Sequence, residues 1–401
     1  MAGVCVCALH LALFAPTIGE PSSILINDFG PQAEAIEGGD LPYADQELEY
    51  PPLSFVVLQA PALVSEGIDA YAEAFQWEML LFDLAIVAVL ALALPGAPRQ
   101  VIAALAVYTL GLLALSGVVL NDSLIDAAPL WLARFDLVPA FLVLAAVLAR
   151  EAGRSATWSA LLAAGAAVKA FPLALYPALL RGERDPRRVI LGGLAVLAYC
   201  VGVVLAIGDS PGSALGYHTE RGLQVEAVFA SPFEVADLFS ETASVVPSAG
   251  GFDVEAAGTG AARWLTILLG GSSYLLVLWA GWRARVSHLE LTTALLAVMV
   301  VFAPVLSPQF LLWLLPVSAA AYGLGRENVL LLAALVLTQM ELQYFHQVSD
   351  LGSHWVWRVA ARNAVLLAYL WVVCAPIVRA GGIWRRPAPG LAPAPRPERI
   401  A

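Results

Sequence analysis

An acidic stretch close to the N-terminus carries the residues best suited to chemistry on a hydroxyl group. Residues 27–52 follow the first apolar segment and have Asp28 as their second residue. A Gly-Gly-Asp turn lies at 38–40, and the pair Glu49 and Tyr50 follows further on. A carboxylate such as Asp28 can act as a general base, taking a proton from an acceptor hydroxyl. An aspartate that follows a helix is more often a cap or a solvated loop residue, so this role needs support from the rest of the chain.

Several cations could serve the same reaction, because a phosphate leaving group needs positive charge to hold it rather than a strong acid. Lys169 is the only lysine and lies in an apolar run, where it either contacts a lipid phosphate or extends its charge to the interface. Arg134 either pairs with Asp136 at a helix entrance or contacts phosphate or sugar. His218 and Arg221 would share one face of a helical turn, as a second clamp or as part of a solvated loop.

Other chemistries have little support in the sequence. Gln309 follows Ser307-Pro308 in a break between two apolar runs, which suggests a turn exposed to a cavity. The histidines are too dispersed for a metal signature, and no glycine-rich loop for ATP or a dinucleotide is present. The four cysteines all lie in apolar runs. We therefore expect no cofactor and no obligatory metal.

The composition indicates a protein embedded in a lipid bilayer. Of 401 residues, 60% are hydrophobic and 13% are charged, and the mean hydropathy is +0.78. A soluble domain carries roughly 25% charged residues. Only acidic charges precede Arg99, so nucleic acid is an unlikely partner for this part of the chain.

The apolar runs predict an all-α, multi-pass protein with one transmembrane domain over residues 1–380. A run at 52–64 is too short to span and is predicted to be an interfacial helix. The tail at 381–401 is rich in Pro and Arg and is expected to be disordered. The predicted spans cover residues 4–18, 75–94, 101–120, 130–148, 189–207, 264–282, 289–306, 310–322, 329–344 and 356–378.

The run at 157–180 is predicted to form two short helices that turn back on each other. Lys169 to Pro172 interrupts it, and proline disfavours a helix there. Arginines flank the run on both sides, so both of its ends should face the cytoplasm. The pair brings the total to about 12 membrane segments, and interrupted helices of this kind often line a cavity.

The arginines fall in alternate loops, which predicts the orientation of the chain in the plasma membrane. With the N-terminus inside, the loops at 19–74 and 208–262 are the two large extracytoplasmic ones. Both are acidic or neutral with few arginines. The candidate site residues named above gather at this extracytoplasmic side.

Seven pieces of the chain, in this order, resemble a known family. The resemblance is to the actinobacterial family 87 glycosyltransferases, which are GT-C membrane enzymes similar to polyprenol-phosphate-mannose-dependent alpha-mannosyltransferases, and it covers roughly residues 28–363. The first helix is short with no basic residues before it, and the loop after Ser231 diverges from the family. The pieces are Asp28, GGDLPY (38–43), EYPPL (49–53), RFDLVP (134–139), VKAFP (168–172), YHTERGLQ (217–224) and LSPQFLLW (306–313).

The resemblance implies a GT-C fold and an inverting transfer of a sugar from a beta-linked polyprenyl phosphate to a hydroxyl outside the membrane. The acceptor would be a glycolipid or glycan, and the sugar a hexose with mannose as first choice. Asp28 matches the family's catalytic aspartate in the first outside loop. The residues expected to bind substrate are Lys169, His218, Arg221, Glu49, Tyr50, Arg134 and Gln309.

Three alternatives stay open on sequence grounds. A related enzyme could use a different lipid-linked sugar, such as a pentose in an arabinosyltransferase. A transporter or flippase for a lipid-linked sugar would suit the broken helix pair and the intramembrane Lys169, although no repeated halves are visible. A non-catalytic cell-envelope assembly protein could retain the same scaffold.

Overall fold

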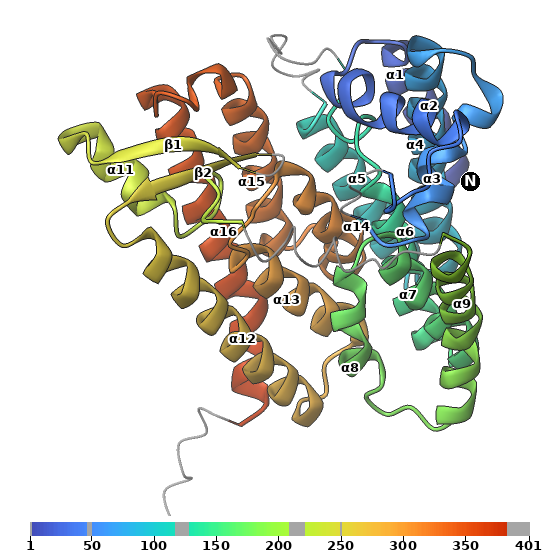
Figure 1. Ribbon diagram of the computed structural model, residues 1–401. Helices are drawn as coiled ribbons and strands as arrows, with labels where there is room; N and C mark the ends of the chain where they lie inside the picture. The colour runs from blue at the N-terminus through green and yellow to red at the C-terminus, as the bar shows by residue number, and fades with distance from the viewer. Residues whose placement is uncertain (1, 46–49, 117–127, 208–220, 249–250, 383–401) are drawn as a thin grey trace, which may run out of the picture.

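The computed structural model describes residues 2–45, 50–116, 128–207, 221–248 and 251–382 (Figure 1). The chain is mostly helical, as its composition of helix-forming Ala and Leu favours. Its helices and helical turns are α1 (Ala2–Phe14), η1 (Ala15–Thr17), η2 (Leu25–Phe29), α2 (Gly30–Glu37), α3 (Ser54–Gln59), η3 (Ala62–Val64), α4 (Ile68–Ala93), α5 (Pro98–Ala114), α6 (Leu137–Glu151), α7 (Ser155–Val168), η4 (Phe171–Leu175), α8 (Tyr176–Leu179), α9 (Pro186–Ile207), α11 (Ser231–Ser240), α12 (Thr259–Arg283), α13 (His288–Val301), η5 (Pro308–Phe310), α14 (Leu311–Tyr322), α15 (Arg326–Leu342), η6 (Phe345–Gln347) and α16 (Ser353–Ala380).

Four helices in the described part of the chain are long and apolar enough to cross a membrane. They are α4, the Pro186–Val203 part of α9, α12 and α16. The other apolar helices are shorter; α1, for example, has 13 residues and is extended by the single turn η1. A helix of this length falls short of the roughly 20 residues that a straight span requires.

The helices form two groups that meet at α14 (Figure 1). In the first group α7 packs against both α6 and α9, and α4 packs against α1 and α6. In the second group α16 packs against α12, α13 and α15. Because α14 contacts α5 and α6 as well as α13, it joins the groups into one buried core.

The first helix is held against its neighbours by a buried polar contact. The His10 Nδ1 atom lies 2.7 Å from Asp83 Oδ2 on α4, and His10 Nε2 lies 2.8 Å from Thr109 Oγ1 on α5. Both His10 and Asp83 are fully buried. Buried polar side chains are stable when they bond one another in this way, so the contact fixes α1 against α4 and α5.

The predicted helix break in the 157–180 run is confirmed. Helix α7 ends at Val168, Lys169 has extended backbone angles, and the chain then turns into η4 and α8. The Tyr176 hydroxyl donates to the Ser159 carbonyl at 2.7 Å, and Trp158 Nε1 donates to Glu183 at 3.0 Å. These contacts show that the two arms run antiparallel, as the basic flanks indicated.

The second large loop corrects the all-α prediction, because it contains a β-hairpin. Strands β1 (Ala243–Ser248) and β2 (Gly251–Ala256) pair antiparallel, with Ala243 opposite Ala256. Val254 of β2 is buried, and its N–H donates to the Leu223 carbonyl at 2.9 Å. The strands are short and polar on one face, so no long apolar run marks them in the sequence. The chain is therefore mostly helical rather than all-α.

The predicted interfacial segment at 52–64 forms two short pieces, α3 and η3, instead of one helix. Pro61 lies between them and fits the first turn of η3 better than the interior of a longer helix. The Leu53 N–H donates to the Ala167 carbonyl near the end of α7 at 2.8 Å. The first loop is thereby anchored to the helix break.

The arginine-rich turns meet at one end of the molecule. Arg181 donates to the carbonyls of Gly281 at 2.8 Å and Ala284 at 3.1 Å. Arg150 donates to the carbonyl of Leu179 at 2.7 Å. The turns after α6, α8 and α12 therefore lie together, as the alternation of arginines along the sequence predicts.

Candidate functional site

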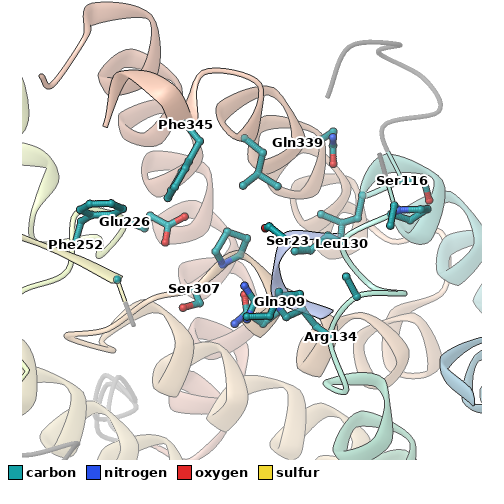
Figure 2. Close-up of a pocket in the computed structure, with 18 of the residues that line it drawn as sticks. Ser23, Ser116, Leu130, Arg134, Glu226, Phe252, Ser307, Gln309, Gln339 and Phe345 are labelled. Carbon is teal, nitrogen blue, oxygen red and sulfur yellow. The ribbon is translucent and has the colours of Figure 1, made fainter. Parts of the chain in front are cut away.

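A cavity of about 210 Å³, lined by both apolar and polar residues, is drawn in Figure 2. It lies at the helix ends opposite the arginine-rich turns. We call it the helix-end pocket. It is bounded by the C-terminal ends of α5 and α15, by the segments that precede α6 and η5, and by the loop before α11. The residues that line it are Ser23, Ile24, Leu115, Ser116, Ala128, Pro129, Leu130, Ala133, Arg134, Gln224, Val225, Glu226, Gly251, Phe252, Ser307, Pro308, Gln309, Gln339, Leu342 and Phe345.

Two of the predicted site residues, Arg134 and Gln309, line this pocket. Figure 2 labels both among the side chains drawn around the cavity. Arg134 follows a buried segment in which Trp131 Nε1 donates to Ser116 Oγ at 3.0 Å. Gln309 lies in the turn η5, which starts at Pro308. The Ser-Pro break that the sequence indicated therefore does face a cavity.

Glu226 also lines this pocket, although no role was predicted for it. Backbone hydrogen bonds hold its loop in place: Gln224 N–H donates to the Pro304 carbonyl and Val225 N–H to the Phe252 carbonyl, both at 3.0 Å. Only 4% of Glu226 is exposed. Burial raises the pKa of its carboxyl group to about 7, although the nearby Arg362 and Arg134 guanidinium groups lower it.

Behind Glu226 lies a buried polar network on α15 and α16. The Arg362 guanidinium donates to Glu341 Oε1 at 2.6 Å and to the Glu226 carbonyl at 2.6 Å. Asn363 Nδ2 donates to Ser231 Oγ at 2.8 Å. Arg362 is completely buried, so these bonds replace the water that its charge would otherwise bind.

Lys169 has a carboxylate partner in this structure. Its Nζ donates to Asp136 Oδ1 at 2.8 Å, and Trp313 Nε1 donates to the same oxygen at 2.7 Å. The ammonium lies 5.3–5.6 Å from the ring centroids of Tyr50, Phe135, Phe310 and Trp313. Such rings stabilise a cation through their negative faces.

This arrangement also changes the pairing expected for Asp136. The sequence left open a local ion pair between Arg134 and Asp136, but Asp136 pairs with Lys169. Arg134, in contrast, lines the helix-end pocket. A direct contact between Lys169 and a lipid phosphate remains a prediction, and it would require the ammonium to leave or share Asp136.

The ion pair between Lys169 and Asp136 should contribute to stability as a coupled unit. We expect Lys169→Met and Asp136→Asn each to lower the unfolding temperature of the purified protein in detergent. The loss of stability in the double variant should be smaller than the sum of the losses in the two single variants, by about 0.5–3 kcal/mol. Lys169→Arg, which keeps the charge, serves as the control. Additive effects of the two substitutions would contradict the pairing.

Asp28 lies one helical turn beyond pocket residues rather than inside the pocket lining. It is exposed in the π-helical turn η2, which follows Ser23 and Ile24, and both of these line the pocket. The neighbouring Phe29 packs on Phe135 at a centroid distance of 5.8 Å. This contact fixes the Asp28 turn next to the Arg134 segment.

The remaining predicted site residues fall into two groups. Tyr50 packs edge-on against Phe135 at 4.8 Å and forms one wall around Lys169. Arg221 lies beside Gly251, which lines the pocket. Glu49 and His218 lie outside the described residues, so their roles stay predictions.

Several pocket residues had no signal in the sequence. Glu226 and Gln339 lie in segments far apart in the chain, and neither belongs to a motif with a known spacing. The only indication is that Glu226 follows His218 and Arg221 in a polar part of the sequence. A buried carboxyl group can be recognised as unusual only when the fold shows which side chains surround it.

The chemistry that this site can perform follows from its groups. A guanidinium, a carboxyl group and several amides converge on a cavity with aromatic walls, which suits an anionic group that also carries hydroxyls. Among the described residues, no cluster of His, Cys, Asp or Glu could hold a metal ion. In comparisons with known proteins, no family model, no curated protein and no solved structure matches this chain.

Proposed function

We propose that this protein is a multi-pass glycosyltransferase of the plasma membrane, with a GT-C-type fold and about 12 membrane segments. It moves a hexose, with mannose as the first candidate, from a polyprenyl phosphate to a hydroxyl of a glycolipid or glycan. The reaction takes place on the extracytoplasmic side, with inversion at the anomeric carbon. Asp28 is the general base.

The observation that carries this proposal is the position of the helix-end pocket. It lies at the end of the helices opposite the arginine-rich turns, and arginine-rich loops face the cytoplasm in membrane proteins. The pocket then faces the outside, where a sugar carried on a membrane lipid is accessible. A largely apolar helical protein has few other reasons to gather charged and amide groups at this end.

The proposed reaction assigns a task to each group. The acceptor hydroxyl oxygen attacks the anomeric carbon while the bond from that carbon to the phosphate oxygen breaks. The phosphate leaves with the electron pair, and the guanidinium of Arg134 stabilises its charge. Asp28 accepts the hydroxyl proton. Gln309 and Gln339 offer amide groups that can orient sugar hydroxyls.

Removing the Arg134 charge should impair transfer. We expect Arg134→Gln to lower kcat about 10²-fold, by analogy with the loss of one preorganised donor at an oxyanion. Arg134→Lys should keep part of the activity, because it keeps the charge but loses the planar donor pair. Arg187→Gln, an exposed arginine near the opposite end, is the matched control. Equal rates of transfer for Arg134→Gln and Arg187→Gln would show that Arg134 does not contribute to the reaction.

Supplying labelled polyprenyl-phosphate mannose to membranes that contain the protein tests the function. The expected result is label in a new glycolipid, absent from membranes without the protein. Unlabelled polyprenyl-phosphate arabinose in competition distinguishes a hexose from a pentose donor. Labelled product that forms equally in both membranes would overturn the proposal.

A further inference from the structure

Three buried acidic side chains surround a single buried guanidinium next to the helix-end pocket. Glu341 bonds Arg362 directly at 2.6 Å, and Glu226 lies on the segment whose carbonyl Arg362 also binds. Glu234, on α11, packs toward α16 and interacts electrostatically with Arg362, Glu341 and Glu226. Glu234 and Glu341 are fully buried and Glu226 nearly so. We call Glu226, Glu234 and Glu341 the acid cluster.

The charges in the acid cluster do not balance if every carboxyl group is ionised. Three negative charges would face one positive charge from Arg362. Arg134 adds a second cation from the pocket side, which still leaves one negative charge in excess. An uncompensated buried charge is costly, so at least one of the three carboxyl groups takes up a proton instead. In the part of the chain that the structure describes, no group of His, Cys, Asp and Glu could hold a metal ion whose positive charge would replace that proton.

The hydrogen bonds of the cluster point to the same conclusion. Both oxygens of Glu234, Oε1 of Glu226 and Oε2 of Glu341 are buried without a hydrogen-bond partner. Four acceptors in this position are costly when the carboxylates are ionised, because an anion needs donors around it. Burial raises the pKa of Glu234 well above its ordinary value, in the same direction as that of Glu226.

Of the three acids, Glu226 is the one that lines the pocket. Figure 2 shows its carboxyl group directed toward the cavity, with Ser307, Gln309 and Arg134 around the same space. Its Oε2 has only a long contact of 3.4 Å to Gln224 Nε2. A protonated carboxyl group in this position has an O–H to donate, and the pocket side is where a ligand can accept it.

Resting on the function proposed above, we propose that Glu226 is a ligand-contacting residue whose protonated carboxyl group donates a hydrogen bond to an oxygen of the bound sugar-phosphate group. Arg362, Glu341 and Glu234 act behind it as positioning residues, since they set the charge around its carboxyl group. Arg134 faces it from the pocket. Deprotonation of Glu226 would remove the donor and place a negative charge next to an anionic ligand.

This assignment has a definite pH dependence. A carboxyl group whose pKa is raised to about 7 is protonated below that pH and ionised above it. Ligand binding should therefore be strongest on the acidic side and weaken as the pH rises through neutrality. If only the protonated form binds, the affinity falls up to about tenfold per pH unit on the alkaline side. The phosphodiester of the ligand does not titrate in this range.

The test measures binding of labelled short-chain prenyl-phosphate mannose to the purified full-length protein in detergent, between about pH 6 and pH 9. We compare the wild type with Glu226→Gln, Glu226→Ala and the exposed control Glu255→Gln. The wild type and the control should lose affinity above neutral pH. Glu226→Gln should bind with little pH dependence, because its amide remains a neutral donor, and Glu226→Ala should bind weakly throughout.

Infrared spectroscopy of the same samples reports the proton directly. The expected result is a component of the protonated carboxyl band that disappears as the pH is raised through neutrality and that is missing in Glu226→Gln. A Glu226→Gln variant with the wild-type pH profile, an unchanged carboxyl band, or no binding of the probe to the wild type would overturn the assignment. If the probe binds and Glu226 titrates as expected but no sugar is transferred, the result would contradict the glycosyltransferase function and leave the role of Glu226 in binding intact.

Discussion

Replacing Asp28 by asparagine is expected to lower the rate of glycosyl transfer by about 10²- to 10⁴-fold, the usual contribution of a positioned general base. Asparagine has nearly the same shape but cannot accept the acceptor proton. Asp28 is exposed, so the substitution should leave the fold and donor binding unchanged. The measurement is the initial rate of label incorporation into glycolipid at matched amounts of folded protein.

An exposed acid on the adjoining helix supplies the control for this experiment. Glu37 ends α2, shortly after Asp28, and Glu37→Gln removes one negative charge from the same outside loop. This variant should keep the wild-type rate. Equal rates for wild type and Asp28→Asn would exclude Asp28 as the base and direct attention to Glu226 as the pocket's own carboxyl group.

Replacing Arg362 by methionine should cause the largest loss of stability. The substitution leaves Glu341 without its partner at 2.6 Å and removes the donor to the Glu226 carbonyl. Breaking a buried ion pair by removing one side typically costs about 3–5 kcal/mol. The expected result is a markedly lower unfolding temperature in detergent, or protein that fails to accumulate in the membrane.

A second substitution separates lost charge from lost packing. In the double variant Arg362→Met/Glu341→Gln the buried carboxylate is neutral, so part of the stability should return. Arg379→Met, an exposed residue near the end of the same helix, is the control and should unfold like the wild type. A normal unfolding temperature for Arg362→Met would show that the network contributes little.

The sequence predicted those features of the fold that depend on local pattern. The break at Lys169 to Pro172 was visible because a proline and a charge interrupt an otherwise apolar run, and α7 does end at Val168. The clustering of arginine-rich turns at one end was visible because their spacing alternates with the apolar segments. Helices are found at the predicted apolar runs, and four of those in the described residues are long enough to span a membrane.

The features that depend on contacts between distant segments could not be predicted. The pair of Lys169 and Asp136 joins residues 33 positions apart, and Arg362 binds the Glu226 carbonyl across 136 positions. Nothing local distinguishes Glu226 from other acids in a polar loop; its character comes from its burial next to the Arg362 and Arg134 guanidinium groups. The β-hairpin escaped prediction because its strands are short and their apolar face is small.

The most direct test of the account places the purified protein in liposomes that contain labelled beta-linked polyprenyl-phosphate mannose and an acceptor glycolipid. It follows both the covalent state of the label and the leaflet in which the donor lies. The account predicts label in a new alpha-glycosidic bond, with loss of this product in Asp28→Asn. Movement of intact donor between leaflets without a new glycosidic bond would contradict it and identify a flippase instead.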